Sequence, residues 1–136
     1  MFLNLLNDEE KSIFLKLAIA VIQADGKLEE SEKQYIADYS REMGITEYSL
    51  DGKIEITALA EKIGKDSTNT AKRIFLLELT ACANADGDFA DTEKALINSL
   101  VKTFKLSNSS LQECLDLLAE YTKVSAKLMS FVQEGK

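Results

Sequence analysis

Two stretches of the chain, "QADGKLEESE" (residues 23–32) and "ANADGDFADTE" (residues 83–93), decide the fold. Each follows a long apolar run, and in each the triplet Ala-Asp-Gly is followed by a Glu seven positions after the Asp. Glycine adopts the backbone angles that end a helix, and Asp-Gly is a common turn. Each stretch is therefore predicted to form the turn of a helical hairpin.

The two hairpins are copies of one another. When the chain is shifted by 61 residues, "IFL" at 13–15 falls on "IFL" at 74–76, and the two Ala-Asp-Gly triplets coincide. The repeats span about residues 13–50 and 74–111. Two copies are too few for a solenoid, and each copy has an apolar first helix that the other can bury. We expect one all-α domain over residues 1–136, a compact bundle of about six or seven helices built from two pseudo-symmetric hairpins.

Caps and stop signals give the expected helix boundaries. A first helix is capped by Asn7 together with Glu10 and runs to about Asp25, and a second covers about 30–43 and stops at Gly44. The remaining boundaries are a helix ending at Gly64, a helix from Asp66 to about Asp86, a helix over about 90–104, and a final stretch capped by Ser107 or Asn108 and bent near Thr122.

The composition narrows the class of protein. The chain has a formal charge of −7 and contains neither His nor Pro. An acidic surface repels the phosphates of nucleic acids, and the absence of His removes the commonest general base. The apolar runs are shorter than the ~20 residues that span a bilayer, and the N-terminal stretch lacks the basic region of a signal peptide. We therefore expect a cytoplasmic protein that is not inserted in a membrane and has no nucleic-acid partner.

The two cysteines, Cys82 and Cys114, lie 32 positions apart on apolar helical segments and form no C-x-x-C pair. Buried cysteines of this kind pack as small apolar side chains. We expect both to be reduced and mostly buried.

Glu78 interrupts the apolar run "IFLLELTACA" at residues 74–83. A buried Glu is rare unless it is paired. We expect this carboxylate at the edge of the core, paired with Lys72, Arg73 or Lys16, or serving as a further carboxylate near the acidic turns.

Two interpretations of the Asp-Gly turns stay open. In the first they are turns only, and Glu32 and Glu93 stabilise the first turns of the helices that follow. In the second they bind a cation, because both match part of the calcium-binding EF-hand loop, with Asp at position five, Gly at six, an apolar residue at eight and Glu at twelve. The first position, which needs an Asp, holds Val21 or Cys82. The turns are therefore not EF-hands, and a cation site would need water or carboxylates from elsewhere.

The second turn offers more oxygen atoms than the first. Asn84 and Asp88 lie beside Asp86, whereas Lys27 stands in the first turn where Asp88 stands in the second. Because a nearby lysine repels a cation, we expect the Asp86 turn to bind a divalent cation more strongly than the Asp25 turn.

The pair "ADGKLEESE" and "ADGDFADTE" resembles the TerB-like family, the tellurite-resistance protein B group. The resemblance covers about Asn7 to Tyr121, and related domains occur in some membrane-anchored J-domain co-chaperones. It implies an all-helical fold, no established catalytic activity, and a stress-response role in multiprotein complexes near the membrane. It also implies a divalent cation held by Asp25, Glu32, Asp86 and Glu93. The oxygens of the second turn add Asn84 and Asp88 as further candidates, and Ca²⁺ or Mg²⁺ is the expected ion.

Three functions follow as hypotheses. The first is a cation-responsive binding module, and the second is a metal-independent protein–protein interaction domain of the co-chaperone type. The third, an enzyme with a carboxylate pair as acid and base, is the weakest, because the sequence has no nucleophile elbow, P-loop or metal-hydrolase motif.

Overall fold

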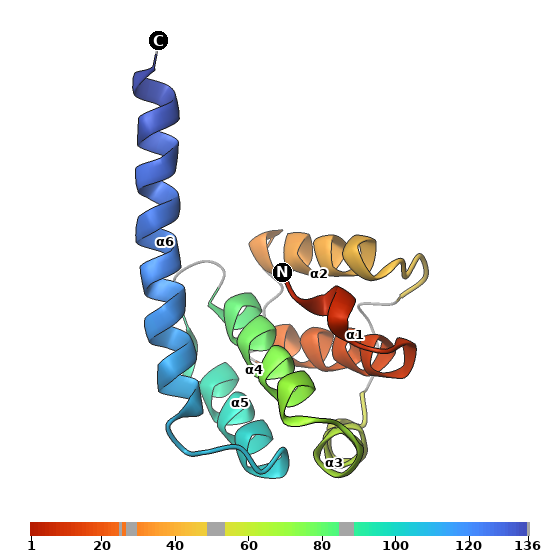
Figure 1. The fold of residues 1–136 in the computed structure, drawn as a ribbon. Coiled ribbons are helices and arrows are strands. Elements are labelled where there is room, and N and C mark those ends of the chain that lie inside the picture. Colours follow the sequence, from red (N-terminus) through yellow and green to blue (C-terminus); the bar gives the residue numbers. More distant parts are fainter. Residues whose placement is uncertain (25, 27–29, 49–53, 85–88, 136) are drawn as a thin grey trace.

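The computed structural model describes residues 1–24, 26, 30–48, 54–84 and 89–135. Within these ranges the chain forms helices and no strand, so the all-α prediction is confirmed (Figure 1). The elements are a 3₁₀ helix η1 (Leu3–Leu5) and the α-helices α1 (Asp8–Gln23), α2 (Glu30–Met43), α3 (Ile56–Asp66), α4 (Asn69–Ala83), α5 (Asp91–Thr103) and α6 (Ser110–Glu134).

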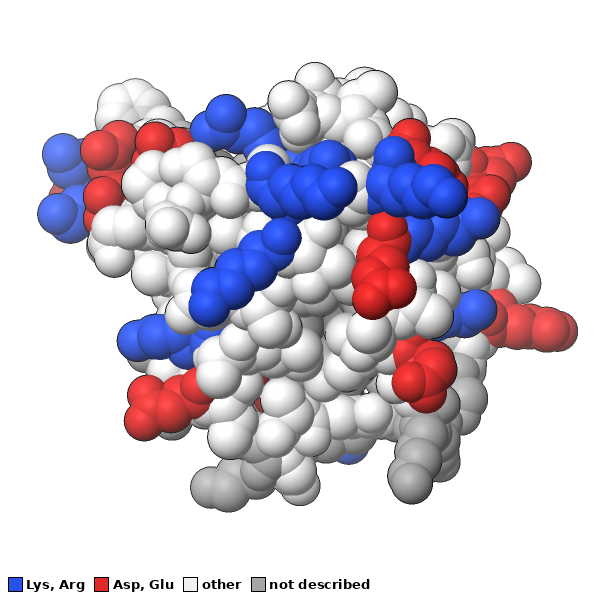
Figure 2. Space-filling model, turned by 90° about the horizontal axis from the view of Figure 1, so that it is seen from below, with Lys and Arg blue, Asp and Glu red and all other residues white. Residues whose placement is uncertain are grey.

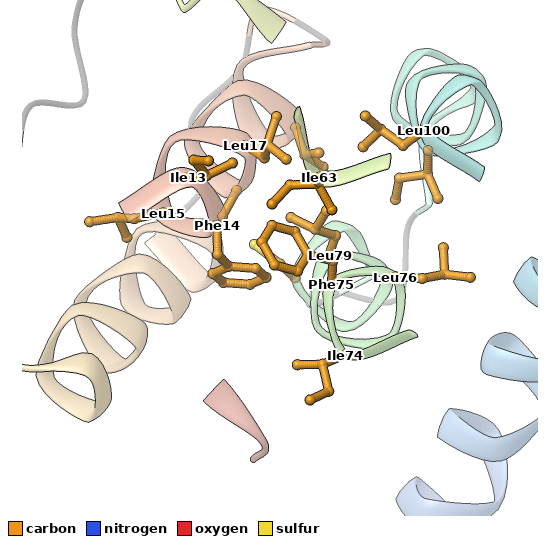
Figure 3. Close-up of a cluster of buried hydrophobic side chains, with 14 of the residues drawn as sticks. Ile13, Phe14, Leu15, Leu17, Ile63, Ile74, Phe75, Leu76, Leu79 and Leu100 are labelled. Atoms are coloured by element: carbon orange, nitrogen blue, oxygen red, sulfur yellow. The ribbon is translucent and has the colours of Figure 1, made fainter. Parts of the chain in front are cut away.

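The centre of the bundle is the contact between α1 and α4, the apolar first helices of the two repeats. The rings of Phe14 and Phe75 meet edge to face across this contact, with centroids 5.5 Å apart (Figure 3). Phe104, just beyond α5, and Tyr39 of α2 extend the cluster with further edge-to-face contacts. Such pairs add about 0.5–1.5 kcal/mol to the free energy gained by burial. The aromatic cluster therefore links both hairpins in one core.

The helices of each predicted hairpin pack on one another. α2 packs on α1, and α5 packs on α4. The two hairpins contact each other mainly through α1 and α4, as expected from their apolar first helices. The superposition of residues 13–50 on 74–111 stays a prediction.

Several helix ends agree with the sequence-based boundaries. At the start of α1 the Asn7 side chain accepts a hydrogen bond from the Glu10 N–H at 2.8 Å, and the Glu10 carboxylate accepts one from the Asn7 N–H at 2.9 Å. This reciprocal pair is the predicted capping box. At the end of α2, Gly44 has a φ of +74°, a left-handed conformation that favours glycine.

Other predicted boundaries are wrong. Gly64 lies inside α3 rather than after it. The residue is a glycine here because a side chain would collide with the backbone carbonyl of Thr103 on α5. Thr68, not Asp66, caps α4, accepting a hydrogen bond from the Ala71 N–H at 3.1 Å. α6 follows Ser109 and continues through Thr122 as one helix.

Only the beginning of α6 packs against the bundle, where it contacts α4 and α5. Its second half extends beyond the other helices (Figure 1). Among the described residues no helix is both long enough and apolar enough to cross a membrane.

Candidate functional site

Glu32 and Glu93, the acidic residues that end the two repeated motifs, occupy equivalent places. Each lies in the first turn of the second helix of its hairpin, α2 or α5. The sequence leaves their burial open, but the structure settles it, because Glu32 is only 3% exposed and Glu93 only 1%. Two carboxylates in the interior need specific electrostatic support.

Part of that support is local. The Glu93 carboxylate accepts a hydrogen bond from the Ala90 N–H at 3.3 Å, at the N-terminus of α5. The amide dipoles at a helix N-terminus favour a negative charge. The interpretation of these glutamates as helix-start residues is therefore consistent with their position.

Cys82 lies near the end of α4, in the second hairpin. Burial raises the pKa of the Cys82 thiol, and the negative charges of Glu32, Glu93 and Glu78 raise that pKa further. One buried glutamate from each hairpin therefore acts on the charge of this thiol.

Cys82 stands at a position that matters for cation binding in EF-hand loops. Cys82 occupies the first place of the EF-like frame in the second repeat, where an EF-hand has an Asp. The negative charge of Glu32, from the other hairpin, acts on the thiol at that place.

The remaining predicted ligands are placed as follows. Asp25, Asp86 and Asp88 lie outside the described residues. Asn84 caps the C-terminus of α4 and is half-buried, with its N–H bonded to the Thr80 carbonyl at 3.0 Å. Within the described part of the chain, no three Asp, Glu, Cys or His side chains are grouped so that they could hold a metal ion. A cation site would therefore need the aspartates of the turns as well as Glu32 and Glu93.

Glu78 has a partner that sequence reasoning missed. It is 2% exposed and accepts a hydrogen bond from the Met1 ammonium at 2.8 Å, so pairing with Lys72, Arg73 or Lys16 is wrong. Glu42 also contacts this ammonium, at 3.3 Å. The interruption of an apolar run signalled that Glu78 is paired, but nothing in the sequence pointed to η1 folding back over α2.

A groove of about 440 Å³ opens beside Glu78, between α2, α4 and α6. Tyr35, Tyr39 and Glu42 line it with Leu118 and Tyr121 of α6. The Tyr39 hydroxyl donates to the Glu78 backbone carbonyl at 2.7 Å, and burial raises the pKa of Tyr39. Tyr39 therefore stays neutral and fixes α2 against α4.

A second groove, of about 460 Å³, lies between α1 and α3. Its lining is mainly apolar, from Leu15, Ile19, Ile54 and Leu59, with Lys16 among its few charged residues. Ser12 also lines this groove, one helical turn from Lys16.

The cysteines differ from each other. Both are free thiols, and Cys82 is fully buried as predicted. Cys114 is only half-buried, so the expectation of a mostly buried side chain is wrong for it. It lies in the part of α6 that packs on the bundle from one side only.

Figure 2 shows the end of the molecule that lies at the bottom of Figure 1, where Lys and Arg side chains cross the surface and acidic groups lie around them. The helices at this end, α3 and α5, carry Lys65 and Lys102 in their last turns, where positive charge is favoured. This face therefore carries basic groups although the chain has a formal charge of −7.

Comparison with known proteins gave no match to a family model, to a curated protein or to a solved structure.

Proposed function

We propose that the protein is a non-enzymatic, TerB-like interaction module that binds a divalent cation between its two acidic turns. The observation that supports this most directly is the burial of Glu32 and Glu93, one from each hairpin. The resemblance of the two motifs to the TerB-like family extends the proposal to a stress-response role, with protein partners in the cytoplasm near membrane-bound complexes.

The electrostatics favour a cation at this place. Two like charges that approach one another in the interior repel, and a divalent cation turns that repulsion into attraction. Ca²⁺ and Mg²⁺ prefer carboxylate and carbonyl oxygens, which these motifs supply. In the proposal Asp25, Glu32, Asp86 and Glu93 are the ligands, with Asn84 and Asp88 as additional oxygen donors.

The cation would act as a link between the hairpins. Glu32 begins α2 and Glu93 begins α5, so a shared ion would tie the starts of these two helices together. A surface formed by both hairpins would then depend on the cation concentration, which is how a cation-responsive module controls a partner.

The alternative is a metal-independent protein–protein interaction domain. One observation favours it, namely that the Glu93 carboxylate already accepts the Ala90 N–H at the start of α5. Helix N-termini stabilise carboxylates without a metal ion. In this alternative the glutamates only fix the turns.

A titration with CaCl₂ and with MgCl₂, followed by amide NMR of the full chain, separates the two functions. The proposal expects saturable shifts that include the amides of both Gly26 and Gly87, and a rise in melting temperature with cation concentration. Glu93→Gln and Glu32→Gln should each weaken binding. Glu47→Gln, an exposed site on the other groove, is the matched control and should not.

The variants also test whether there is one site or two. If both Glu32→Gln and Glu93→Gln weaken the cation binding that produces one common set of amide shifts, the two glutamates share one site. Two independent sets of shifts, each lost with one glutamate, would mean separate sites, and Asp86→Asn should then weaken binding more than Asp25→Asn. Shifts that do not saturate with either ion would leave the metal-independent domain as the function.

A further inference from the structure

One face of α6 carries an apolar stripe, which we define as Leu117, Tyr121, Val124, Leu128 and Phe131. These side chains are 54–78% exposed, with Phe131 the most exposed. Large exposed apolar patches on soluble proteins commonly mark contact sites. The stripe is therefore a candidate contact surface.

The spacing of the stripe identifies the kind of occupant. Successive members are four, three, four and three residues apart, and Cys114 continues the series three residues before Leu117. This alternation is the heptad pattern of a coiled coil, in which the a and d positions of one helix face those of another. With Cys114 at a, the stripe gives two full heptads on a helix that is continuous from Ser110 to Glu134.

We propose that the occupant is a second copy of this chain, whose α6 packs antiparallel along the stripe. In antiparallel coiled coils an a residue faces a d residue of the other helix. The register centred between residues 122 and 123 pairs Tyr121 with Val124, Leu117 with Leu128, and Cys114 with Phe131. By two-fold symmetry each pair occurs twice, as a closed dimer requires.

The charges in the middle of the helix favour this orientation. The g positions beside the stripe hold Glu113, Glu120, Lys127 and Glu134, and an antiparallel pair brings g residues of the two helices together. In the register above, Glu120 of each copy faces Lys127 of the other, which gives two ion pairs of opposite charge. Glu113 faces Glu134 of the other copy, and the Arg73 guanidinium, 3.1 Å from the Glu113 carboxylate, offsets this like-charge approach. A parallel pair would instead place Glu120 beside Ser125 and Lys127 beside Val132, with no ion pair. Flanking charges of this kind set orientation and partner choice.

The bundle also receives the end of the second helix. A notch of about 120 Å³ lies between α4 and α6, with Leu76, Leu77, Cys114 and Leu117 in its lining and Arg73 and Glu113 at its rim. The proposed register sets Phe131 of the second copy against Cys114, which is this notch. An exposed aromatic ring and an apolar recess are thus brought together by the spacing that pairs the charges.

The charges of α6 also favour a protein over a lipid surface as the occupant. Residues 119–135 contain two Lys and two Glu, so this half of the helix has no net charge. Helices that lie on anionic membranes carry an excess of Lys and Arg on their polar face. The sequence opposite the stripe lacks that excess.

Sedimentation equilibrium of the full chain tests the dimer. The expected mass is 30.2 kDa, twice the 15.1 kDa of one chain. Leu128→Glu should give a 15.1 kDa monomer with unchanged helix content by circular dichroism, because Leu128 lies outside the core. Lys123→Glu, on the polar face, is the matched control and should stay dimeric.

Charge exchange tests the orientation. Glu120→Lys alone and Lys127→Glu alone should each weaken the dimer about tenfold, because both symmetric ion pairs become repulsive. An equimolar mixture of the two variants should recover wild-type affinity, because both pairs between positions 120 and 127 in the mixed dimer are again of opposite charge. A parallel dimer would respond to neither variant.

Three results would overturn the proposal: a wild-type chain that stays at 15.1 kDa at all accessible concentrations, a dimer unaffected by Leu128→Glu, or variants whose mixture does not recover. A monomer that instead cosediments with phosphatidylcholine vesicles would assign the stripe to a lipid surface. Because Glu32 and Glu93 are buried at the starts of α2 and α5 and are not part of the stripe, cation binding and the mass of the dimer are measured as separate results.

Discussion

α4 and α6 are both long helices rich in apolar residues, yet α4 is mostly buried and α6 is mostly exposed. Eleven of the 15 residues of α4 are buried, whereas only Ser110 and Leu111 are buried among the 25 residues of α6. α4 has apolar residues on almost every face, so it needs neighbours on every side. α6 has them on one broad face, with charged residues opposite. The number of apolar residues in a helix therefore does not determine how many of its residues are buried here. What matters is how the apolar residues are distributed around the helix.

The largest test of this contrast removes one phenylalanine from each helix. Phe75 of α4 is fully buried between Phe14 and Phe104, so Phe75→Ala should lower the free energy of unfolding by about 3–5 kcal/mol. Phe131 of α6 is 78% exposed, and Phe131→Ala should change it by less than about 0.5 kcal/mol in the monomer. Urea unfolding at low protein concentration measures both. Equal losses would mean that α6 is part of the core.

A second test concerns the closest approach of two helices in the bundle. In Gly64→Ala the new methyl group would collide with the Thr103 carbonyl, and we expect a loss of about 1–3 kcal/mol. At an open helix site the same change stabilises, by up to about 1 kcal/mol. Ser130→Ala, on the exposed part of α6, is the control and should be neutral or slightly stabilising. A Gly64→Ala chain more stable than wild type would contradict the packing of α3 on α5.

The two cysteines allow the contrast to be tested by pH. In the unfolded chain the Cys82 thiol ionises near its ordinary pKa of 9.0, while burial in the folded state raises that pKa. The contribution of this thiol to the free energy of unfolding is therefore fully present below about pH 8. It declines as the pH rises above that, by up to about 1.4 kcal/mol per pH unit. Cys82→Ala should flatten the decline in stability between about pH 8 and pH 10.

Cys114 supplies the comparison. Burial raises the pKa of its thiol too, but the Arg73 guanidinium opposes that rise, and the side chain is half-exposed. Cys114→Ala should therefore change the slope less than Cys82→Ala. The pKa values of Tyr39 and the Met1 ammonium are also raised, so these groups also lower the stability of the folded protein as the pH rises. Both groups are present in both variants and do not affect the comparison. Equal slopes for wild type and Cys82→Ala would exclude the buried thiol as a cause.

The smallest expected effect compares how α1 and α6 begin. Asn7→Ala removes the capping box of α1 and should cost about 1 kcal/mol. The Ser109 side chain makes no capping hydrogen bond to α6, so Ser109→Ala should cost less than half of that. Thermal unfolding of both variants under the same conditions would measure the difference. A larger loss at Ser109 would reverse this ranking of the caps.

The parts of the fold that local chemistry determines were predictable from the sequence. The capping box of Asn7 and the stop at Gly44 depend on residues within one turn, and both are confirmed. Gly64 misled the prediction because its role is a contact with Thr103, which lies 39 positions away in the sequence. Local stop signals cannot distinguish a glycine that ends a helix from one that lets another helix approach.

The candidate site shows the same division. The spacing of Glu32 and Glu93 located both glutamates in first turns, which the structure confirms. Their burial depends on how α2 and α5 pack in the bundle, and no local pattern encodes that. The same holds for Glu78, whose partner is the Met1 ammonium, 77 positions away in the sequence.

The central contact between α1 and α4 also has a kinetic consequence. Contacts within each hairpin join segments that are close in sequence, whereas α1 meets α4 only after a much longer loop is closed. Closing longer loops costs more entropy, and contacts between distant segments slow folding. We therefore expect each hairpin to form early and their docking to set the folding rate. Phe14→Leu, which weakens the docked aromatic pair, should then slow refolding in a chevron experiment, whereas Asn7→Ala should mainly speed unfolding. A duplicated hairpin would in that case fix the order of assembly as well as the architecture.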